Sequence, residues 1–301
     1  MKSGVGVEKN YLSINWAKVW DYAILTKPRI SLFVALSTCV GFVLGSWPET
    51  QMVTMLHVLL ATLLVAGGSG VLNQFLERDL DARMKRTENR PLPTGRLKAA
   101  EANLFGLLVS ACGILYMGLV VNWLASFLAA LTWGIYLFVY TPLKTKTVQN
   151  TAVGAVAGAL PPVGGWAAAQ GEIPLAAWVL FAIMFTWQFP HFLSIAWIYR
   201  ADYARGGHRM LPVEDLEGSR TSARILFYSL LLLPLGVVPV FLGMSGWIYG
   251  IASILLGLGL FYVGFNFFKE RTDRRARYLM RATLVYLPAL WCAIIVDRLV
   301  M

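Results

Sequence analysis

Long stretches of the chain carry no charged side chain, and charges are concentrated in the short segments between them. Asp, Glu, Lys and Arg are absent from 30–48, 50–76, 102–143, 147–171, 173–199, 225–268 and 282–296. A helix needs about 20 residues, at about 1.5 Å each, to cross the hydrocarbon of a bilayer. Five stretches therefore fit one crossing each, and the stretches of 42 and 44 residues fit two. The pattern predicts an all-α integral membrane protein with nine transmembrane helices.

The two longest stretches are expected to divide where small or polar residues gather. Val121-Asn122-Trp123 and Gly243-Met244-Ser245-Gly246 are the expected turns. The last stretch, 282–296, has only 15 residues. We expect it to span because Arg281 and Arg298 can reach the interfaces from its ends.

Composition agrees with the membrane interpretation and excludes an ordinary soluble domain. Hydrophobic residues make up 57% of the 301 residues and charged residues 14%, against roughly 45–50% and about 25% in soluble domains. Cys39, Cys112 and Cys292 are isolated inside expected helices, so we interpret them as packing residues and not as a metal motif.

The distribution of Lys and Arg predicts the orientation in the membrane. The nine-helix arrangement places 25 of the 26 basic residues on one side and leaves only Arg298 on the other. Because basic loops stay inside, the N-terminus and the charged loops are expected to be cytoplasmic. The net charge of +10 then reflects topology first and attraction to anionic lipid or a diphosphate second, and nucleic acid binding is not expected.

The chain is expected to form a cytoplasmic N-terminal segment, 1–29, and a single nine-helix domain, 30–299. The first 29 residues lack the apolar core of a cleavable signal peptide, so the first helix should stay in the protein. Aromatic and aliphatic residues in this segment form either a short interfacial helix or a frayed tail. They are Tyr11, Leu12, Ile14, Trp16, Val19, Trp20 and Tyr22.

The first candidate site lies where the second expected helix ends. Asn73, Glu77 and Asp81 follow one another at intervals of four residues, which places three oxygen-bearing side chains along one helix face. Mg²⁺ commonly binds one or two carboxylates together with substrate phosphates, so the row predicts half of a Mg²⁺-diphosphate site. The alternative is a solvated helix end whose acids pair with nearby bases.

Basic residues directly after this row favour the diphosphate interpretation, because a polyphosphate requires positive groups. They are Arg83, Lys85, Arg86 and Arg90. Asp79 lies about 200° around the helix from Glu77 and is expected to face away.

Two further segments resemble parts of the same site. Asp202 is followed by basic residues and by Leu211-Pro212, as Asp81 is followed by bases and Leu92-Pro93. This similarity suggests two half-sites facing one cavity, or a chance match. Tyr140, Lys144 and Lys146 form either a further phosphate contact or an ordinary positive loop.

The glycines at 154, 158, 164 and 165 are expected to permit close helix packing.

A proline and an ionisable side chain interrupt the sixth expected helix at Pro190-His191. Polar groups at membrane depth are costly, so His191 is expected to face a cavity or to bond a neighbouring helix. His57 is interpreted as structural, and His208 as a loop residue without an assigned role.

Taken together, the stretches 73–93, 140–166 and 187–213 resemble the UbiA superfamily of intramembrane prenyltransferases, and within it the protohaem IX farnesyltransferases, over residues 19–298. The resemblance implies a Mg²⁺-dependent reaction of farnesyl diphosphate with haem b, giving haem O and diphosphate. It implies that Asn73, Glu77, Asp81 and Asp202 are catalytic and hold the metal. Glu77 stands where Asp is commoner, and Ile198 stands where superfamily members often have another Asp.

The other assignments follow from this resemblance and from the charges together. Arg83, Lys85, Arg86, Arg90, Tyr140, Lys144 and Lys146 would bind diphosphate, and His191 would bind haem iron. The faces of Tyr140, Trp187 and Phe189 would shield the allylic cation. The expected partners are the bilayer and a haem A synthase or terminal oxidase. A UbiA-type enzyme acting on a quinone or chlorin precursor, and a membrane transporter, remain as alternatives.

Overall fold

The computed structural model describes residues 15–300, and throughout this range the secondary structure is helical, with no strand. Nine helical spans in this range are long and apolar enough to cross a membrane, which confirms the expected integral membrane protein. The spans are α2 (Pro28–Ser46), α3 (Met52–Asp81), α4 (Ala99–Val120), α5 (Trp123–Gly134) with its continuation, α7 (Asn150–Gln170), α8 (Leu175–Ile198), α11 (Ser219–Phe241), α12 (Trp247–Lys269) and α13 (Asp273–Val300).

Both expected turns divide the long apolar stretches where the sequence indicated. α4 ends at Val120 and α5 begins at Trp123, while α11 ends at Phe241 and α12 begins at Trp247. The α5 span continues through a π-helix, η1 (Ile135–Tyr140), into the short α6 (Thr141–Leu143). The remaining short helices are α1 (Trp16–Leu25), α9 (Arg200–Arg205) and α10 (Leu211–Glu214).

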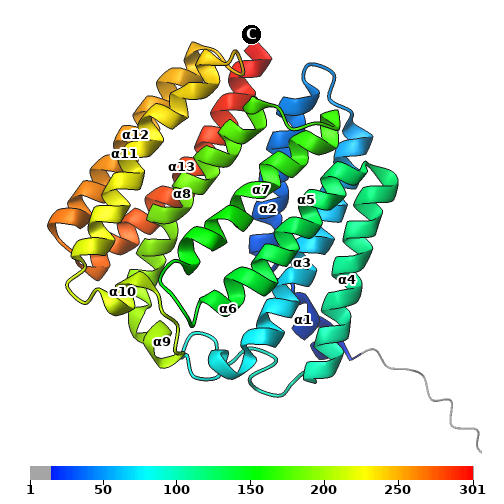
Figure 1. The fold of residues 1–301 in the computed structure, drawn as a ribbon, viewed down its shortest axis with the longest axis vertical. Coiled ribbons are helices and arrows are strands. Elements are labelled where there is room, and N and C mark those ends of the chain that lie inside the picture. Colours follow the sequence, from blue (N-terminus) through cyan, green and yellow to red (C-terminus); the bar gives the residue numbers. More distant parts are fainter. Residues whose placement is uncertain (1–14, 301) are drawn as a thin grey trace, which may run out of the picture.

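α7 and α8 lie side by side and connect helices α2–α5 to helices α11–α13 (Figure 1). α7 packs against α2 and α5 on one side and against α8 on the other, and α8 also packs against α11 and α13. The short helices α1, α6, α9 and α10 gather at one end of the bundle, where α2 and α7 begin and α3 ends (Figure 1). We call this the basic end, because it carries most of the Lys and Arg side chains.

Glycine allows α2 and α7 to approach closely. A Cβ atom at Gly165 would overlap the Thr38 carbonyl oxygen, and a Cβ atom at Gly41 would overlap the Pro162 carbonyl oxygen. The packing role expected for Gly165 is therefore confirmed. Gly164 is different, because a Cβ atom there would come no closer than 4.0 Å to the nearest atom, on Leu128.

α13 is longer than the 15-residue stretch suggested. It spans 28 residues from Asp273 to Val300, because its first turns carry Arg274, Arg275 and Arg277 outside the apolar stretch. At the other end the Arg298 guanidinium lies 6.0 Å from the centre of the Trp47 ring. Basic side chains at both ends thus extend the helix beyond its apolar centre.

Two other local expectations have clear outcomes. Pro190 does not interrupt α8, which runs through it for 24 residues and is supported by α7, α11 and α13. α1 is a helix with Trp16 and Trp20 72% and 69% exposed, as the interfacial alternative requires. Tyr11, Leu12 and Ile14 of that hypothesis lie outside the described residues.

Candidate active site

The last two turns of α3 carry the row of oxygen-bearing side chains at the basic end. Asn73, Glu77 and Asp81 are 2%, 6% and 1% exposed, whereas Asp79 between them is exposed and lies near Arg78. The four-residue spacing therefore points these three groups into the protein. Burial contradicts the solvated helix end of the alternative interpretation, whereas the pairing of the acids with bases that it also expected is observed.

Each member of the row meets a cation from a different segment of the chain. Lys27, the residue before α2, donates from Nζ to Asn73 Oδ1 at 2.7 Å. Lys144 Nζ lies 2.8 Å from Glu77 Oε1, and Arg90 Nη1 lies 2.6 Å from Asp81 Oδ2. Buried carboxylates are costly unless paired, so folding brings these three cations to α3.

Lys27 is the site residue that the sequence did not reveal, since its charge was assigned only to orientation. It precedes α2 with a left-handed backbone, φ 50°, which is uncommon for a residue other than glycine. The pKa of Lys27 is lowered to about 7, first by burial and then by the charges of Arg90 and Lys144, while Glu77 and Asp81 oppose the shift. Pro28 marks the start of the helix in the sequence, but a following proline favours an extended residue and does not predict the left-handed backbone of Lys27.

A π-helix brings Lys144 to Glu77. Pro142 has no N–H to donate to the carbonyl oxygen four residues earlier, which favours the wider turn of a π-helix. Thr141 Oγ1 donates to Tyr136 O at 2.9 Å. Asn73 Nδ2 donates to Thr141 Oγ1 at 3.1 Å, which joins α6 to α3. Burial lowers the pKa of Lys144, but the charge and hydrogen bond of Glu77 together with Tyr140 and Tyr136 outweigh burial and raise it.

The segment after α8 holds Lys144 from the other side. Arg209 N donates to Lys144 O at 2.7 Å, and Arg209 Nη1 donates to Lys146 O at 3.0 Å. Asn150 Nδ2 donates in turn to Arg209 O at 3.0 Å. Arg209 and Asn150 thus position the lysine, a role that only the tertiary structure reveals.

Asp202 reaches the loop that follows α3. Its Oδ1 accepts from Lys85 N at 3.2 Å and forms an ion pair with Arg205. The two acidic segments therefore meet, as the similarity between them suggested. Asp202 is nevertheless paired separately from the α3 row.

His208 is buried in this region, although the sequence left it without a role. Gly207 turns the chain with φ 74°, and the imidazole that follows is 3% exposed, with no hydrogen bond to its Nδ1 from the described part of the chain. Burial lowers the pKa of His208, which keeps the ring neutral next to the cations.

The remaining basic candidates lie further out. The side chains of Arg83, Lys85 and Lys146 are exposed. The guanidinium of Arg86 lies over the rings of Tyr199 and Tyr203, at 5.2 and 5.6 Å from their centres. These four residues surround the buried row at the protein surface instead of contacting it.

His191 lies about three helical turns before Asp202, against α13. Its Nδ1 is 2.8 Å from Thr283 Oγ1, and its ring stacks on Trp187 with centres 4.9 Å apart. Phe189 is on the opposite face of α8, stacked on Tyr228 of α11. Phe189 therefore points away from the face of α8 that carries Trp187 and His191, and its expected role in shielding a cation stays a prediction.

Residues 34–287 match the sequence model of the UbiA prenyltransferase family. The chain belongs to the UbiA prenyltransferase family. Among curated proteins, this UbiA prenyltransferase is 44% identical to the "Protoheme IX farnesyltransferase" of Solibacter usitatus, over 92% of the chain and 98% of that relative. It is 46% identical to the enzyme of the same name from Salinibacter ruber, over 93% and 99%. Membership of an enzyme family decides against the transporter alternative.

Solved structures agree on the fold of this UbiA prenyltransferase. A digeranylgeranylglyceryl phosphate synthase superposes with a TM-score of 0.79 at 18% identity, covering 95% of this chain and all of the other. A UbiA homolog from Archaeoglobus fulgidus bound to DMAPP and Mg²⁺ gives 0.69 at 19% identity, covering 92% and 99%.

The α3 row of this UbiA prenyltransferase fits a magnesium ion that shares its ligands with substrate. Within residues 15–300, no group of three or more His, Cys, Asp or Glu side chains is arranged to hold a metal. The row instead offers two carboxylates and an amide oxygen, and within residues 15–300 Glu77 Oε1 has the ion pair with Lys144 but no hydrogen bond. One or two carboxylates together with substrate phosphates are the usual donors to a protein-bound magnesium ion.

Proposed function

We propose that this chain transfers a farnesyl group from farnesyl diphosphate to a vinyl group of haem b, giving haem O and diphosphate. The supporting observation is the row in which Asn73, Glu77 and Asp81 each contact a cation. The names of the relatives, at 44% and 46% identity over nearly the whole chain, supply the substrates.

The three cations of the row are the inner diphosphate ligands of this proposal. Lys27, Lys144 and Arg90 lie against α3 from three directions, so a diphosphate placed above the row meets positive charge from each. Their charges would stabilise the diphosphate as it departs, which is the electrostatic contribution expected to dominate such a reaction. Arg83, Lys85, Arg86 and Lys146 would attract the substrate from the surface.

Glu77, Asp81 and Asn73 would hold Mg²⁺ once the diphosphate has engaged the lysines and Arg90. When bound, the ion supplies further positive charge to the leaving diphosphate. Asp202, tied to Lys85 N, would fix the 82–98 loop over the site and serve as the opposing acid.

In the reaction, the bond between farnesyl C1 and the diphosphate oxygen breaks, and its electron pair leaves with the diphosphate. The vinyl π electrons of haem b then form the new carbon–carbon bond, and water adds to the resulting cation with loss of a proton. Tyr140 lies beside Lys144, with the ammonium 4.7 Å from its ring centre, where its face can stabilise the allylic cation.

His191 is the proposed haem ligand, and the proposal includes its tautomer. Thr283 Oγ1, which lies 2.7 Å from Met280 O, would donate its proton there and accept from His191 Nδ1–H. The neutral ring then has its lone pair on Nε2. A neutral Nε2 oriented by a hydrogen bond at Nδ1 is the form that ligates iron.

The proposal places residues 30–299 in a bacterial inner membrane as one catalytic domain, with the N-terminal segment 1–29 and the basic end in the cytoplasm. The 25-to-1 distribution of basic residues supports this orientation. Reporter fusions in the 82–98 loop should signal cytoplasm, and fusions at Glu172 should signal the outside. The product would pass to a haem A synthase or directly to a terminal oxidase.

An acceptor assay tests the function. Purified enzyme would receive farnesyl diphosphate and Mg²⁺ with haem b, a chlorin or a quinone precursor, and products would be identified by mass spectrometry. We expect haem O only. Asp81→Asn should reduce turnover by several orders of magnitude, whereas Glu88→Gln, at an exposed acid of the same loop, should not. Preferred prenylation of the quinone or chlorin would replace haem as the acceptor.

A further inference from the structure

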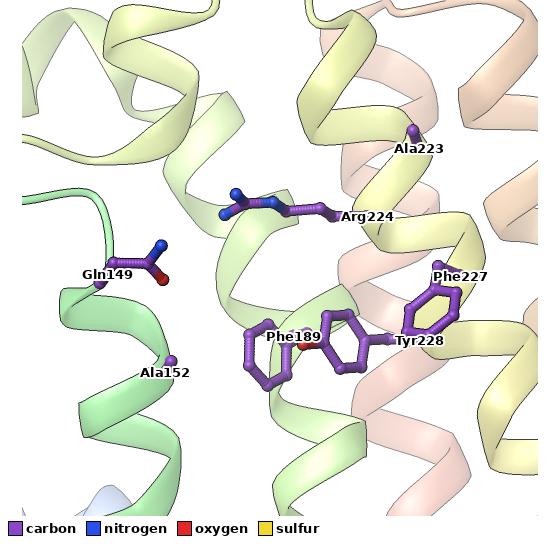
Figure 2. A pocket seen from close by; sticks show the side chains of 7 residues that line it. All are labelled: Gln149, Ala152, Phe189, Ala223, Arg224, Phe227 and Tyr228. Atoms are coloured by element: carbon purple, nitrogen blue, oxygen red, sulfur yellow. The ribbon is translucent and has the colours of Figure 1, made fainter.

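A cleft opens on the outer face of α8, between α7 and α11 at the basic end (Figure 2). Its volume is about 400 Å³. The lining combines two polar side chains with small and aromatic ones: Gln149, Ala152, Phe189, Ala223, Arg224, Phe227 and Tyr228. The residues that line the cleft come from α8, α11 and the start of α7 and not from α3. Trp187 and His191 contact Thr283 of α13 from the other face of α8.

Arg224 extends across this cleft toward Gln149 (Figure 2). Its side chain is half-buried, one to two turns inside α11, and forms no ion pair within residues 15–300. Arg220, one turn earlier on the same helix, instead lies 3.8 Å from Asp215 and donates to Glu214 O. An anion from outside the chain would stabilise this guanidinium, because its cleft supplies no carboxylate.

Aromatic rings continue from the cleft along α8. Phe189 stacks on Tyr228 with ring centres 3.7 Å apart, and Phe227 beside them is 59% exposed. At intervals of three or four residues, Phe185, Phe181 and Trp178 extend this surface toward the other side of the membrane. The surface thus has a cation at its basic end and an apolar wall along its length.

We infer that this cleft binds an anionic phospholipid, with its phosphate on Arg224 and Gln149 and an acyl chain along the aromatic wall. The position of the charge supports this occupant, since Arg224 lies at the basic end, where head groups meet the protein. Anionic lipids concentrate in the leaflet that faces basic loops. Bound there, the lipid connects α7 to α11, which otherwise meet mainly through α8.

Lipid binding to the full-length protein in detergent, measured by native mass spectrometry without substrates, tests this inference. Phosphatidylglycerol should bind more tightly than phosphatidylcholine. Arg224→Gln should weaken phosphatidylglycerol binding about tenfold, the equivalent of one charge-assisted hydrogen bond. Arg224→Lys should retain most of the affinity. Arg277→Gln serves as the matched control, because it removes an exposed positive charge from α13, also at the basic end of the bundle.

A second variant tests the cleft without altering its charge. Ala223→Trp should fill the cleft and weaken the binding of both phosphatidylglycerol and phosphatidylcholine, while Arg224 remains in place. Equal phosphatidylglycerol affinity in Arg224→Gln and Arg277→Gln would overturn the inference, as would equal binding of the two lipids by the unmodified protein. Competitive displacement of phosphatidylglycerol by haem b would also overturn it, by identifying the cleft as a site for the acceptor's carboxylates.

Discussion

Lys144 Nζ lies 2.8 Å from Glu77 Oε1, and the two side chains are only 14% and 8% exposed. The residues are 67 positions apart and belong to different helical spans, so tertiary packing alone creates the pair. The lysine is also held through its backbone by Arg209. The pair therefore stabilises the fold and supplies charge to the proposed reaction, and these two contributions can be separated by mutation.

Lys144→Met should destabilise the protein by about 3–5 kcal/mol, because Glu77 is left buried without its cation. The double variant Glu77→Gln/Lys144→Met should recover much of this loss, since neither charge remains. Turnover should stay at least about 100-fold reduced in both, because the diphosphate lacks its lysine. Thermal unfolding and haem O formation measure the two effects. Recovery of turnover in the double variant would assign the pair to stability alone.

Lys27 predicts a specific dependence of stability on pH. Its pKa of about 7 in the folded protein is below the ordinary 10.5, so between these values the unfolded chain binds more protons. Stability should therefore rise as pH increases from 7 toward 10.5, with the full penalty present below pH 7. Lys27→Met lacks this titration.

In detergent, the apparent Tm of the unmodified protein should therefore rise relative to the apparent Tm of Lys27→Met as the pH increases from 7 to 9. Lys98→Met is the control, because the Lys98 side chain is 84% exposed. A constant difference in Tm between unmodified protein and Lys27→Met across this range would contradict a depressed pKa at Lys27.

Thr283 predicts an indirect effect on haem. Thr283→Val removes the acceptor of His191 Nδ1–H, which releases the ring while leaving its Nε2 intact. The Soret band of bound haem should shift in His191→Ala and, by a smaller amount, in Thr283→Val, with farnesyl diphosphate affinity unchanged. Unaltered haem spectra in both variants, accompanied by a lower Tm, would make this contact purely structural.

Adjacent glycines in α7 predict opposite outcomes. Gly165→Ala forces a Cβ atom into the Thr38 backbone and should cost about 1–3 kcal/mol or more. Gly164→Ala has room and should be neutral or stabilising by up to about 1 kcal/mol through helix propensity. Unfolding midpoints of the two variants give the comparison. Equal destabilisation would mean that α2 and α7 do not pack this closely.

The sequence by itself determined the spans, the turns between them and the row on α3. These features depend on local physics: a bilayer requires about 20 apolar residues per helix, and a four-residue spacing keeps Asn73, Glu77 and Asp81 on one face. The apolar stretch 282–296 predicts a shorter helix than α13, because charged residues mark where the hydrocarbon ends and not where helical hydrogen bonding ends.

Only the tertiary structure decided which cations reach the row. Lys27, Arg90 and Lys144 carry the same signal in sequence as exposed Arg83 and Lys146, because a positive charge near a membrane always reports topology first. Their selection depends on a left-handed turn before Pro28, a π-helix before Lys144 and a backbone bond from Arg209. The placement of His208 and the cleft at Arg224 likewise depend on contacts between distant segments, which local spacing does not encode.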